Sequence, residues 1–266
     1  MIAGLPSIFW LGLALKIAMT AGIVVAASIV VERSGPFIGA LVAALPTAGG
    51  AALIILAVEH DAHFIAQGAI GSMLANVACA FFALTYAALA QRRGLVVSLG
   101  GAIAVWLSVV FLSRLIDWSA VMALAANAIV YPVAIYIGSR FRGDDRARSR
   151  VAFTARDLMW RAGVVTLVVI VVTGLSSSIG SYFSGVFAFF PVAMSSFFII
   201  LHTRAGGPVA ASVAAHVLAP LIGLGLGLAA VHVLAEPLGV WWSYLIGLAI
   251  GVAWNGLLWG WKSGGR

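Results

Sequence analysis

Long apolar runs separated by short polar connections make up almost the whole chain. Most windows of about 19 residues are apolar enough to cross a lipid bilayer, and no connection is long enough to hold a soluble domain. The pattern predicts an all-α polytopic membrane protein with about nine transmembrane helices. Their expected bounds are Ile8–Val31, Pro36–Val58, His63–Ala90, Gly94–Leu112, Ser119–Gly138, Leu158–Leu175, Tyr182–Leu201, Pro208–Ala235 and Leu238–Trp261.

Two of these apolar runs repeat each other, and each contains a proline. Pro46 and Pro191 lie 145 positions apart (191 − 46), and Lys16 and Arg161 keep the same spacing (161 − 16). The match needs no gap from Lys16 to about Asp61. An internal repeat of this kind is a frequent feature of secondary transporters.

The repeat also predicts how the chain is organised. We expect a first four-helix repeat over 1–115, a linking helix and basic cytoplasmic loop over 116–157, and a second four-helix repeat over 158–266. An odd number of predicted helices separates the starts of the two copies, so the copies would lie antiparallel. The fold class is therefore two inverted-topology four-helix repeats joined by one extra helix.

The prolines inside the repeated runs mark the candidate binding site. A proline removes a backbone donor and frees a carbonyl, and in lipid such groups are tolerated only against protein or a water-filled cavity. Broken apolar segments at matching positions of two repeats point to a transporter site, although a kink in a tightly packed helix would give the same pattern. The candidate substrate-binding residues here are Pro46, Thr47, Gly49, Gly50, Pro191, Ser195 and Ser196.

Composition and charge agree with a membrane protein. The chain is 63% hydrophobic and only 9% charged, which excludes an ordinary soluble domain. Its net charge of +7 comes from arginines and lysines in loops next to the spans, so it predicts topology rather than nucleic-acid binding. The basic loops alternate with acidic ones, and we expect the basic set to be cytoplasmic, with the N-terminus outside and the C-terminus cytoplasmic.

Ionisable residues within the spans narrow the expected substrate. All eight Asp and Glu residues fall in or beside loops. Because an acidic side chain within the membrane is what usually binds a transported cation, their absence from the spans disfavours a cationic substrate. Lys16 and Arg161 lie within or at the edges of spans; they would attract an anion at each mouth of a pathway, or extend to the nearer interface. His216 is the candidate for proton coupling, and a packed neutral histidine is its alternative. Asn76 and Asn127 are expected to form interhelical hydrogen bonds.

The second copy resembles the GlpM family of small bacterial inner-membrane proteins. The resemblance is carried by Tyr182, Gly185, Phe190 and Pro191, with Arg161 opening the preceding helix. A weaker version in the first copy comprises Lys16, Phe37, Gly39, Pro46 and Thr47. The chain would then be a tandem, fused duplication of a GlpM-like unit. The resemblance implies a multi-pass protein of the bacterial inner (plasma) membrane and little chemistry.

The first hypothesis is a secondary transporter of a small anionic or neutral metabolite that works by alternating access between the repeats. A lipid or lipid-linked-intermediate translocator and a non-transporting membrane subunit that supports a partner protein are the alternatives. No motif of an enzyme is found, and no cofactor or metal site is expected. The expected partners are membrane lipids, the small-molecule substrate and, as an alternative to a monomer, a second copy in a homodimer; nucleic acid is not expected.

Overall fold

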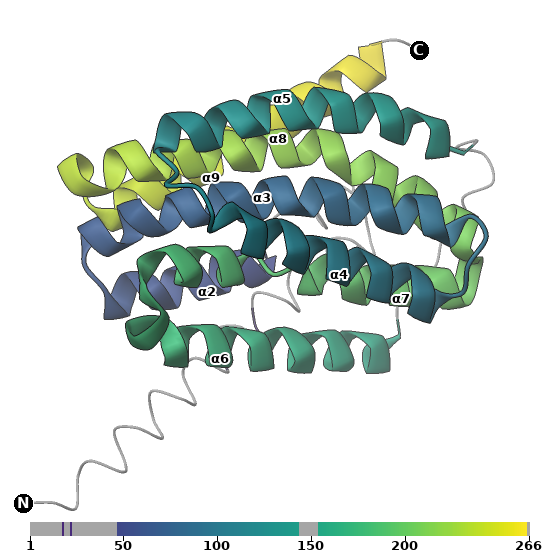
Figure 1. The fold of residues 1–266 in the computed structure, drawn as a ribbon, viewed down its shortest axis with the longest axis horizontal. Coiled ribbons are helices and arrows are strands. Elements are labelled where there is room, and N and C mark those ends of the chain that lie inside the picture. Colours follow the sequence, from purple (N-terminus) through teal and green to yellow (C-terminus); the bar gives the residue numbers. More distant parts are fainter. Residues whose placement is uncertain (1–17, 19–21, 23–46, 144–153, 265–266) are drawn as a thin grey trace, which may run out of the picture.

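The computed structural model describes residues 18, 22, 47–143 and 154–264, and this part of the chain is helical without strands (Figure 1). Eight α-helices and one short 3-10 helix follow one another in it. They are α2 (Thr47–Glu59), α3 (Ala62–Ala90), α4 (Leu95–Ser113), α5 (Ala120–Gly138), η1 (Ser139–Phe141), α6 (Ala155–Ala188), α7 (Val192–Ala205), α8 (Gly207–Leu238) and α9 (Val240–Gly264).

Six helical stretches in the described residues are long and apolar enough to cross a membrane, at 62–90, 95–113, 120–141, 162–205, 207–238 and 240–261. The protein is therefore an all-α, multi-pass membrane protein, as the apolar pattern predicted. The predicted spans at His63–Ala90, Gly94–Leu112 and Ser119–Gly138 match α3, α4 and α5 to within one residue. The predicted span Ile8–Val31 lies outside the described residues except at positions 18 and 22, and Pro36–Val58 is described only from Thr47.

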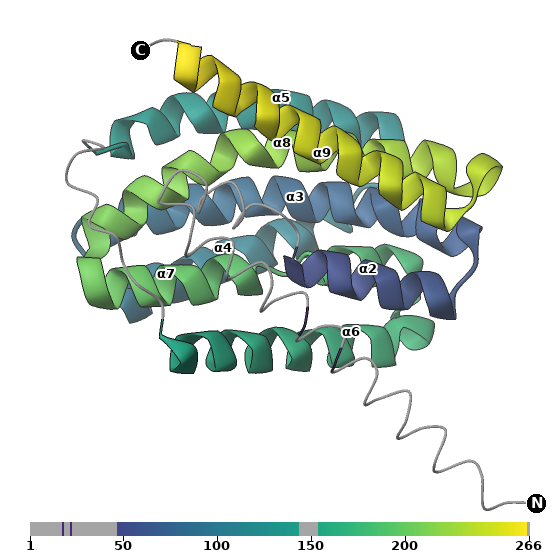
Figure 2. The same ribbon diagram turned by 180° about the vertical axis from the view of Figure 1, so that it is seen from behind.

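Helix α3 lies at the centre of the bundle and packs against α4, α5, α6 and α8 (Figures 1 and 2). Small residues let the neighbouring backbones come close to it. A Cβ atom added to Gly68 would lie 3.2 Å from the carbonyl oxygen of Ser181. Beside it, the Ser72 hydroxyl is 3.0 Å from the Gly185 carbonyl oxygen, to which it donates. These contacts fix α3 against the second half of α6.

Helix α6 reverses its direction at Gly180 (Figure 1). This glycine has φ 78° and ψ 171°, a backbone conformation that residues with a Cβ avoid. The chain before Gly180 forms one long helix, and the chain after it forms a short helix that folds back beside the first. The sequence predicted separate spans at Leu158–Leu175 and Tyr182–Leu201, and the structure adds that the second is two helices with a break between them.

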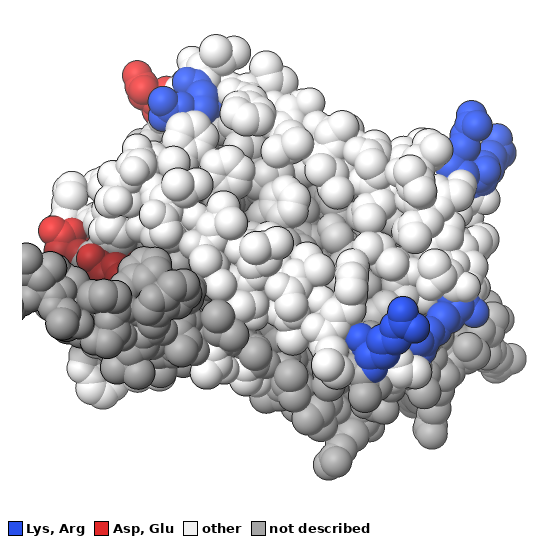
Figure 3. All heavy atoms as spheres, turned by 90° about the horizontal axis from the view of Figure 1, so that it is seen from below, with Lys and Arg blue, Asp and Glu red and all other residues white. Residues whose placement is uncertain are grey.

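Charged side chains are sorted between the two ends of the bundle (Figure 3). The acidic side chains that the structure describes lie at one end, in connections or in the last turns of helices: Glu59, Asp61, Asp117 and Glu236. The described basic side chains lie at the opposite end, apart from Arg114: Arg92, Arg93, Arg140, Arg142, Arg156 and Arg204. The described members of the two loop sets that the sequence separates by charge therefore lie at opposite ends of the bundle, with Arg114 at the acidic end.

Candidate functional site

The predicted helix break at Pro191 is present. The short helix that follows Gly180 ends at Ala188, and α7 begins at Val192, so three residues separate them. The Phe190 N–H still donates to the Phe187 carbonyl at 3.0 Å, and the Val192 N–H turns back to the Phe190 carbonyl at 2.7 Å. Proline has no N–H to continue the ladder, and the break therefore coincides with Pro191, which is buried.

The start of α2 lies against this break. Gly49, in the first turn of α2, is buried, and a Cβ atom added to it would lie 2.8 Å from Cε1 of the Phe189 ring. Only a glycine leaves room for the ring at that distance. Two helices, α2 and α7, thus begin at one place in the middle of the bundle (Figure 2). The first described turn of α2 and the first turn of α7 therefore lie side by side at the break.

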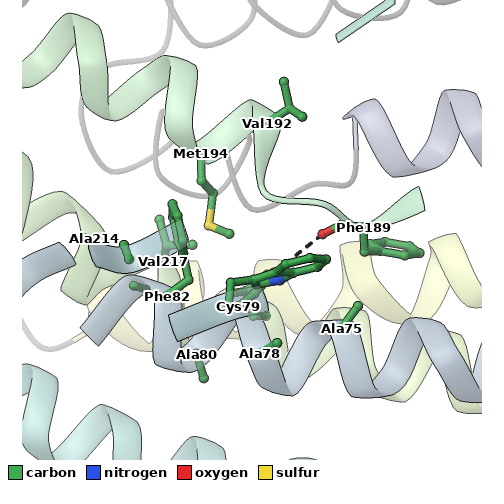
Figure 4. Packing of buried hydrophobic residues seen from close by; sticks show 14 of the residues in the cluster. Ala75, Ala78, Cys79, Ala80, Phe82, Phe189, Val192, Met194, Ala214 and Val217 are labelled. Atoms are coloured by element: carbon green, nitrogen blue, oxygen red, sulfur yellow. Dashed lines mark hydrogen bonds between the residues drawn. The ribbon is translucent and has the colours of Figure 1, made fainter. Parts of the chain in front are cut away.

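A core of small side chains supports the break from the side of α3 (Figure 4). The Cys79 thiol points at the carbonyl oxygen of Phe189, and the sulfur–oxygen distance is 3.7 Å. On the other side the Trp106 ring packs edge-on against Phe190, with 5.1 Å between ring centroids. Neither Cys79 nor Trp106 was predicted from the sequence to belong to the site. Their contacts depend on how α3 and α4 pack, which a uniformly apolar pattern does not reveal.

A cavity of about 160 Å³ lies next to the break, between α2, α8 and α9. Its wall includes the predicted residue Gly50, and a Cβ atom added there would meet nothing within 4 Å. None of the described residues in the wall carries a charge. They are Gly50, Leu53, Ile54, Phe189, Pro220, Leu224, Gly227, Leu228, Val231, Tyr244, Gly247, Leu248, Gly251 and Asn255.

Two side chains give this apolar wall its polar groups. The Tyr244 hydroxyl donates to the Leu53 carbonyl at 3.1 Å and is thereby satisfied. The Oδ1 atom of Asn255 is buried and has no hydrogen-bond partner among the described residues. An unpaired buried acceptor is costly in an apolar setting. The sequence offered one signal for it, an asparagine within an apolar span, but the position of Asn255 beside Gly50 comes only from the fold.

The serines after Pro191 behave differently from each other. Ser196 is buried, and its hydroxyl donates to the Ala193 carbonyl at 2.9 Å, which is the structural role considered for it. The Ser195 Oγ is buried and has no hydrogen-bond partner within the described part of the chain. Neither serine lines the cavity beside Gly50. The structure therefore joins Gly49 and Gly50 to the break at Pro191 but leaves both serines outside the cavity wall.

Other predicted site residues cannot be placed by their side chains. Lys16 and Pro46 lie outside the described residues, although α2 begins at Thr47, directly after Pro46. Thr47 and Arg161 lie in α2 and α6, and the described part of the structure leaves out their side chains. Their roles in binding stay predictions.

His216 makes the contact expected of a packed histidine. Its Nδ1 atom is 2.7 Å from the Ser212 carbonyl one turn earlier in α8, so Nδ1 carries the proton and donates. His216 is absent from the wall of the cavity beside Gly50. A second histidine of α8, His232, donates in the same way to the Ala66 carbonyl of α3 at 2.8 Å. Proton coupling through His216 stays a prediction.

Asn76 and Asn127 join three helices, as predicted. Nδ2 of Asn76 donates to Oδ1 of Asn127 at 2.9 Å and to the Leu221 carbonyl of α8 at 3.0 Å. Asn127 in turn donates to the Met73 carbonyl at 3.0 Å. The Tyr131 hydroxyl completes the cluster by donating to the Asn76 carbonyl at 2.8 Å. This cluster fastens α5 and α8 to α3.

Two further findings concern metal binding and similarity to known proteins. Within the described residues, no group of three or more His, Cys, Asp or Glu side chains lies close enough to hold a metal ion. A comparison with protein-family models, with curated proteins and with solved structures finds no match. The resemblance to the GlpM family stays a prediction.

Proposed function

We propose that this protein is a secondary transporter of a small neutral metabolite and that it works by alternating access between two inverted repeats. The observation that carries the proposal is that the broken helix at Pro191 meets the first described turn of α2 beside a cavity between α2, α8 and α9. Broken helices that meet at mid-depth are typical of transporter sites. The break also lies where the repeated sequence places it.

The helix boundaries support an inverted repeat. Helices α2 and α7 begin at 47 and 192, α3 and α8 at 62 and 207, and α4 and α9 at 95 and 240. Each pair is 145 residues apart, the spacing of the two prolines. In the ribbon, the two members of each pair run in opposite directions (Figure 1). Three pairs with one spacing and reversed directions favour a duplication with inverted topology over a chance similarity of apolar runs.

A contact in the centre of the bundle agrees with such a symmetry. Asn76 in α3 donates to the carbonyl of Leu221 in α8, and these two residues are 145 positions apart. In a two-fold arrangement, residues next to the axis contact their own equivalents. The Asn76–Leu221 hydrogen bond would therefore lie beside the pseudo-two-fold axis that relates the repeats.

The cavity wall favours a neutral substrate over an anionic one. No described residue of the wall is charged, and an ion without a partner in such a place would pay a large desolvation cost. The same apolar wall is the observation that favours the second candidate function, a translocator of lipids or lipid-linked intermediates. The two differ in whether the cavity opens to water in turn at both ends of the bundle.

The separation of charges between the ends gives the proposed orientation. Cytoplasmic loops are enriched in Lys and Arg, so the end that carries Arg92, Arg93, Arg140 and Arg142 would face the cytoplasm of a bacterial inner membrane. The acidic end, with Glu59 and Glu236, would then face outward.

Cysteine labelling tests the proposed function directly. Cys79 is the only cysteine, so a Cys79→Ala background allows one new thiol at a time. We expect Gly50→Cys in oriented vesicles to react with a membrane-impermeant maleimide from either side. Val58→Cys and Val96→Cys, exposed at opposite ends of the bundle, should each react from one side only and so report the orientation.

Gly256→Cys is the matched control, because Gly256 is exposed on α9 outside the cavity. In the membrane it should react from neither side. Labelling of Gly50→Cys from one side only, under every condition, would contradict alternating access. Labelling from neither side would favour the lipid translocator.

A further inference from the structure

The cavity has a counterpart in the other repeat, and that counterpart is filled by aromatic rings. At the 145-residue spacing, the wall residues Gly251, Val231 and Leu53 correspond to Trp106, Tyr86 and Phe198 (251 − 106, 231 − 86 and 198 − 53). All three aromatic side chains have 0% exposure. Rings therefore occupy in one repeat the positions that a glycine and two aliphatic residues hold in the other.

These rings pack in a definite way. Tyr86 stacks on Phe198 with 4.4 Å between centroids, and Trp106 meets Phe190 edge-on. Cys79 and Phe82, which correspond to Leu224 and Gly227, lie in the same filled region (Figure 4). At the 145-residue spacing, Gly251 leaves open the position that the Trp106 ring occupies in the first repeat.

Asn255 adds a hydrogen-bond acceptor to that space. Its counterpart, 145 residues earlier, is the buried aliphatic residue Val110. The buried Asn255 Oδ1 has no partner among the described residues, and a buried acceptor is stabilised by a donor. The second repeat thus lacks the rings that the first repeat has at the counterparts of Leu53, Val231 and Gly251, and it has an acceptor at Asn255. Its own rings in the wall, Phe189 and Tyr244, correspond to Ala44 and Leu99.

We propose that the cavity binds an uncharged molecule with one aromatic ring or two fused rings, whose N–H or O–H donates to Asn255 Oδ1. The cavity of about 160 Å³ is close in size to an engineered apolar cavity of ~150 Å³ that binds benzene. The proposal deepens the proposed function by naming the class of its substrate, and it rests on that function and on its inverted repeat.

The test uses the full-length protein in lipid nanodiscs and ¹⁹F NMR of two probes. 5-Fluoroindole offers an N–H, and 5-fluoro-1-methylindole offers the same rings without it. We expect saturable binding of both, with 5-fluoroindole binding about tenfold more tightly, as one hydrogen bond to a buried acceptor would give. A fluorinated alkane is the third probe and should not bind saturably.

Three variants locate the binding. Asn255→Leu should remove the preference for 5-fluoroindole and keep the binding of the methylated probe. Gly251→Trp should abolish the binding of both, because it restores the ring found in the first repeat; its Cβ would have only an ordinary contact of 3.8 Å, with Gly223. Gly256→Trp is the matched control on the same helix, where an added Cβ meets nothing within 4 Å. It should bind both probes normally.

Three outcomes would overturn the proposal. The first is that neither indole binds saturably, the second is that Asn255→Leu keeps the wild-type preference for 5-fluoroindole over the methylated probe, and the third is that the fluorinated alkane binds as tightly as the indoles. The last outcome would identify a site for a lipid chain. Binding does not require transport, so the test is separate from cysteine labelling. Indole binding without two-sided labelling would refute the transporter and keep the ligand site, whereas two-sided labelling without indole binding would refute only this ligand class.

Discussion

At the scale of single residues, two adjacent glycines in the first turn of α2 have opposite surroundings. Gly49 is buried against the Phe189 ring, whereas Gly50 faces the cavity. The sequence singled out both as places of close approach, and the structure shows that only Gly49 has that role. Their side-by-side positions in one helix make them a matched pair for mutation.

We predict that Gly49→Leu destabilises the protein and that Gly50→Leu does not. A side chain at Gly49 must displace the Phe189 ring, and overpacking of this kind costs about 1–3 kcal/mol. At Gly50 the added side chain enters free space. Unfolding of the purified proteins by SDS titration measures both. Equal losses of stability would show that α2 does not pack against the break as described.

The buried asparagine cluster is the other residue-scale feature with a measurable effect. Asn127→Leu removes the hydrogen bonds to Asn76 and to the Met73 carbonyl, and we expect a loss of about 1 kcal/mol, the usual size for interhelical hydrogen bonds in membranes. Ser108→Ala is the control, since the Ser108 hydroxyl is bonded only within its own helix among the described contacts. The same SDS titration compares the two variants. If Asn127→Leu is as stable as the wild type, the cluster does not stabilise the packing of α5 against α3.

At the scale of elements, the turn at Gly180 decides the shape of the second repeat. It sends the short helix after it back along α6, and this places the break at Pro191 opposite α2. A proline inside an apolar run was a readable signal, and the break is where it predicted. Gly180 gave no comparable signal, because thirty glycines are spread along the chain and most of them serve close helix packing.

We predict that Gly180→Ala destabilises the fold by about 1–3 kcal/mol, because an L-residue is strained at φ 78° and ψ 171°. Gly174→Ala, in the preceding helix with open space around its Cβ, should be neutral or slightly stabilising. Thermal unfolding in detergent compares the two variants. If Gly180→Ala unfolds at the same temperature as the wild type, residue 180 does not have the positive φ described here.

At the scale of the whole molecule, the sequence predicted the class, the bounds of α3, α4 and α5 and the break at Pro191, but not the part of the cavity wall that α8 and α9 supply. Apolar runs show where helices α3, α4 and α5 begin and end, because those bounds lie where polar connections meet lipid-compatible segments. They do not show which face of each helix is buried, since spans that are apolar on all faces lack the amphipathic period. Asn255 and Gly251 therefore became site candidates only once α9 was placed beside α2.

The orientation of the molecule follows from the sorted charges, and it can be measured with fusions. We predict that a C-terminal green fluorescent protein is fluorescent in bacterial cells and that a C-terminal alkaline phosphatase is inactive, because the basic end would be cytoplasmic. Truncation after Leu115, at the acidic end, should reverse both reporters. The same reporter activity at both fusion points would contradict the proposed topology.

The most direct test of alternating access is a pair of distances measured by double electron–electron resonance in lipid nanodiscs. Spin labels on Val58 and Trp241 span one end of the bundle, and labels on Thr203 and Val96 occupy the positions 145 residues away, at the other end. Two inverted repeats that open in turn predict two distances for each pair, with the long distance at one end accompanying the short distance at the other. A single narrow distance for both pairs, unchanged by 5-fluoroindole or by lipid composition, would contradict the account.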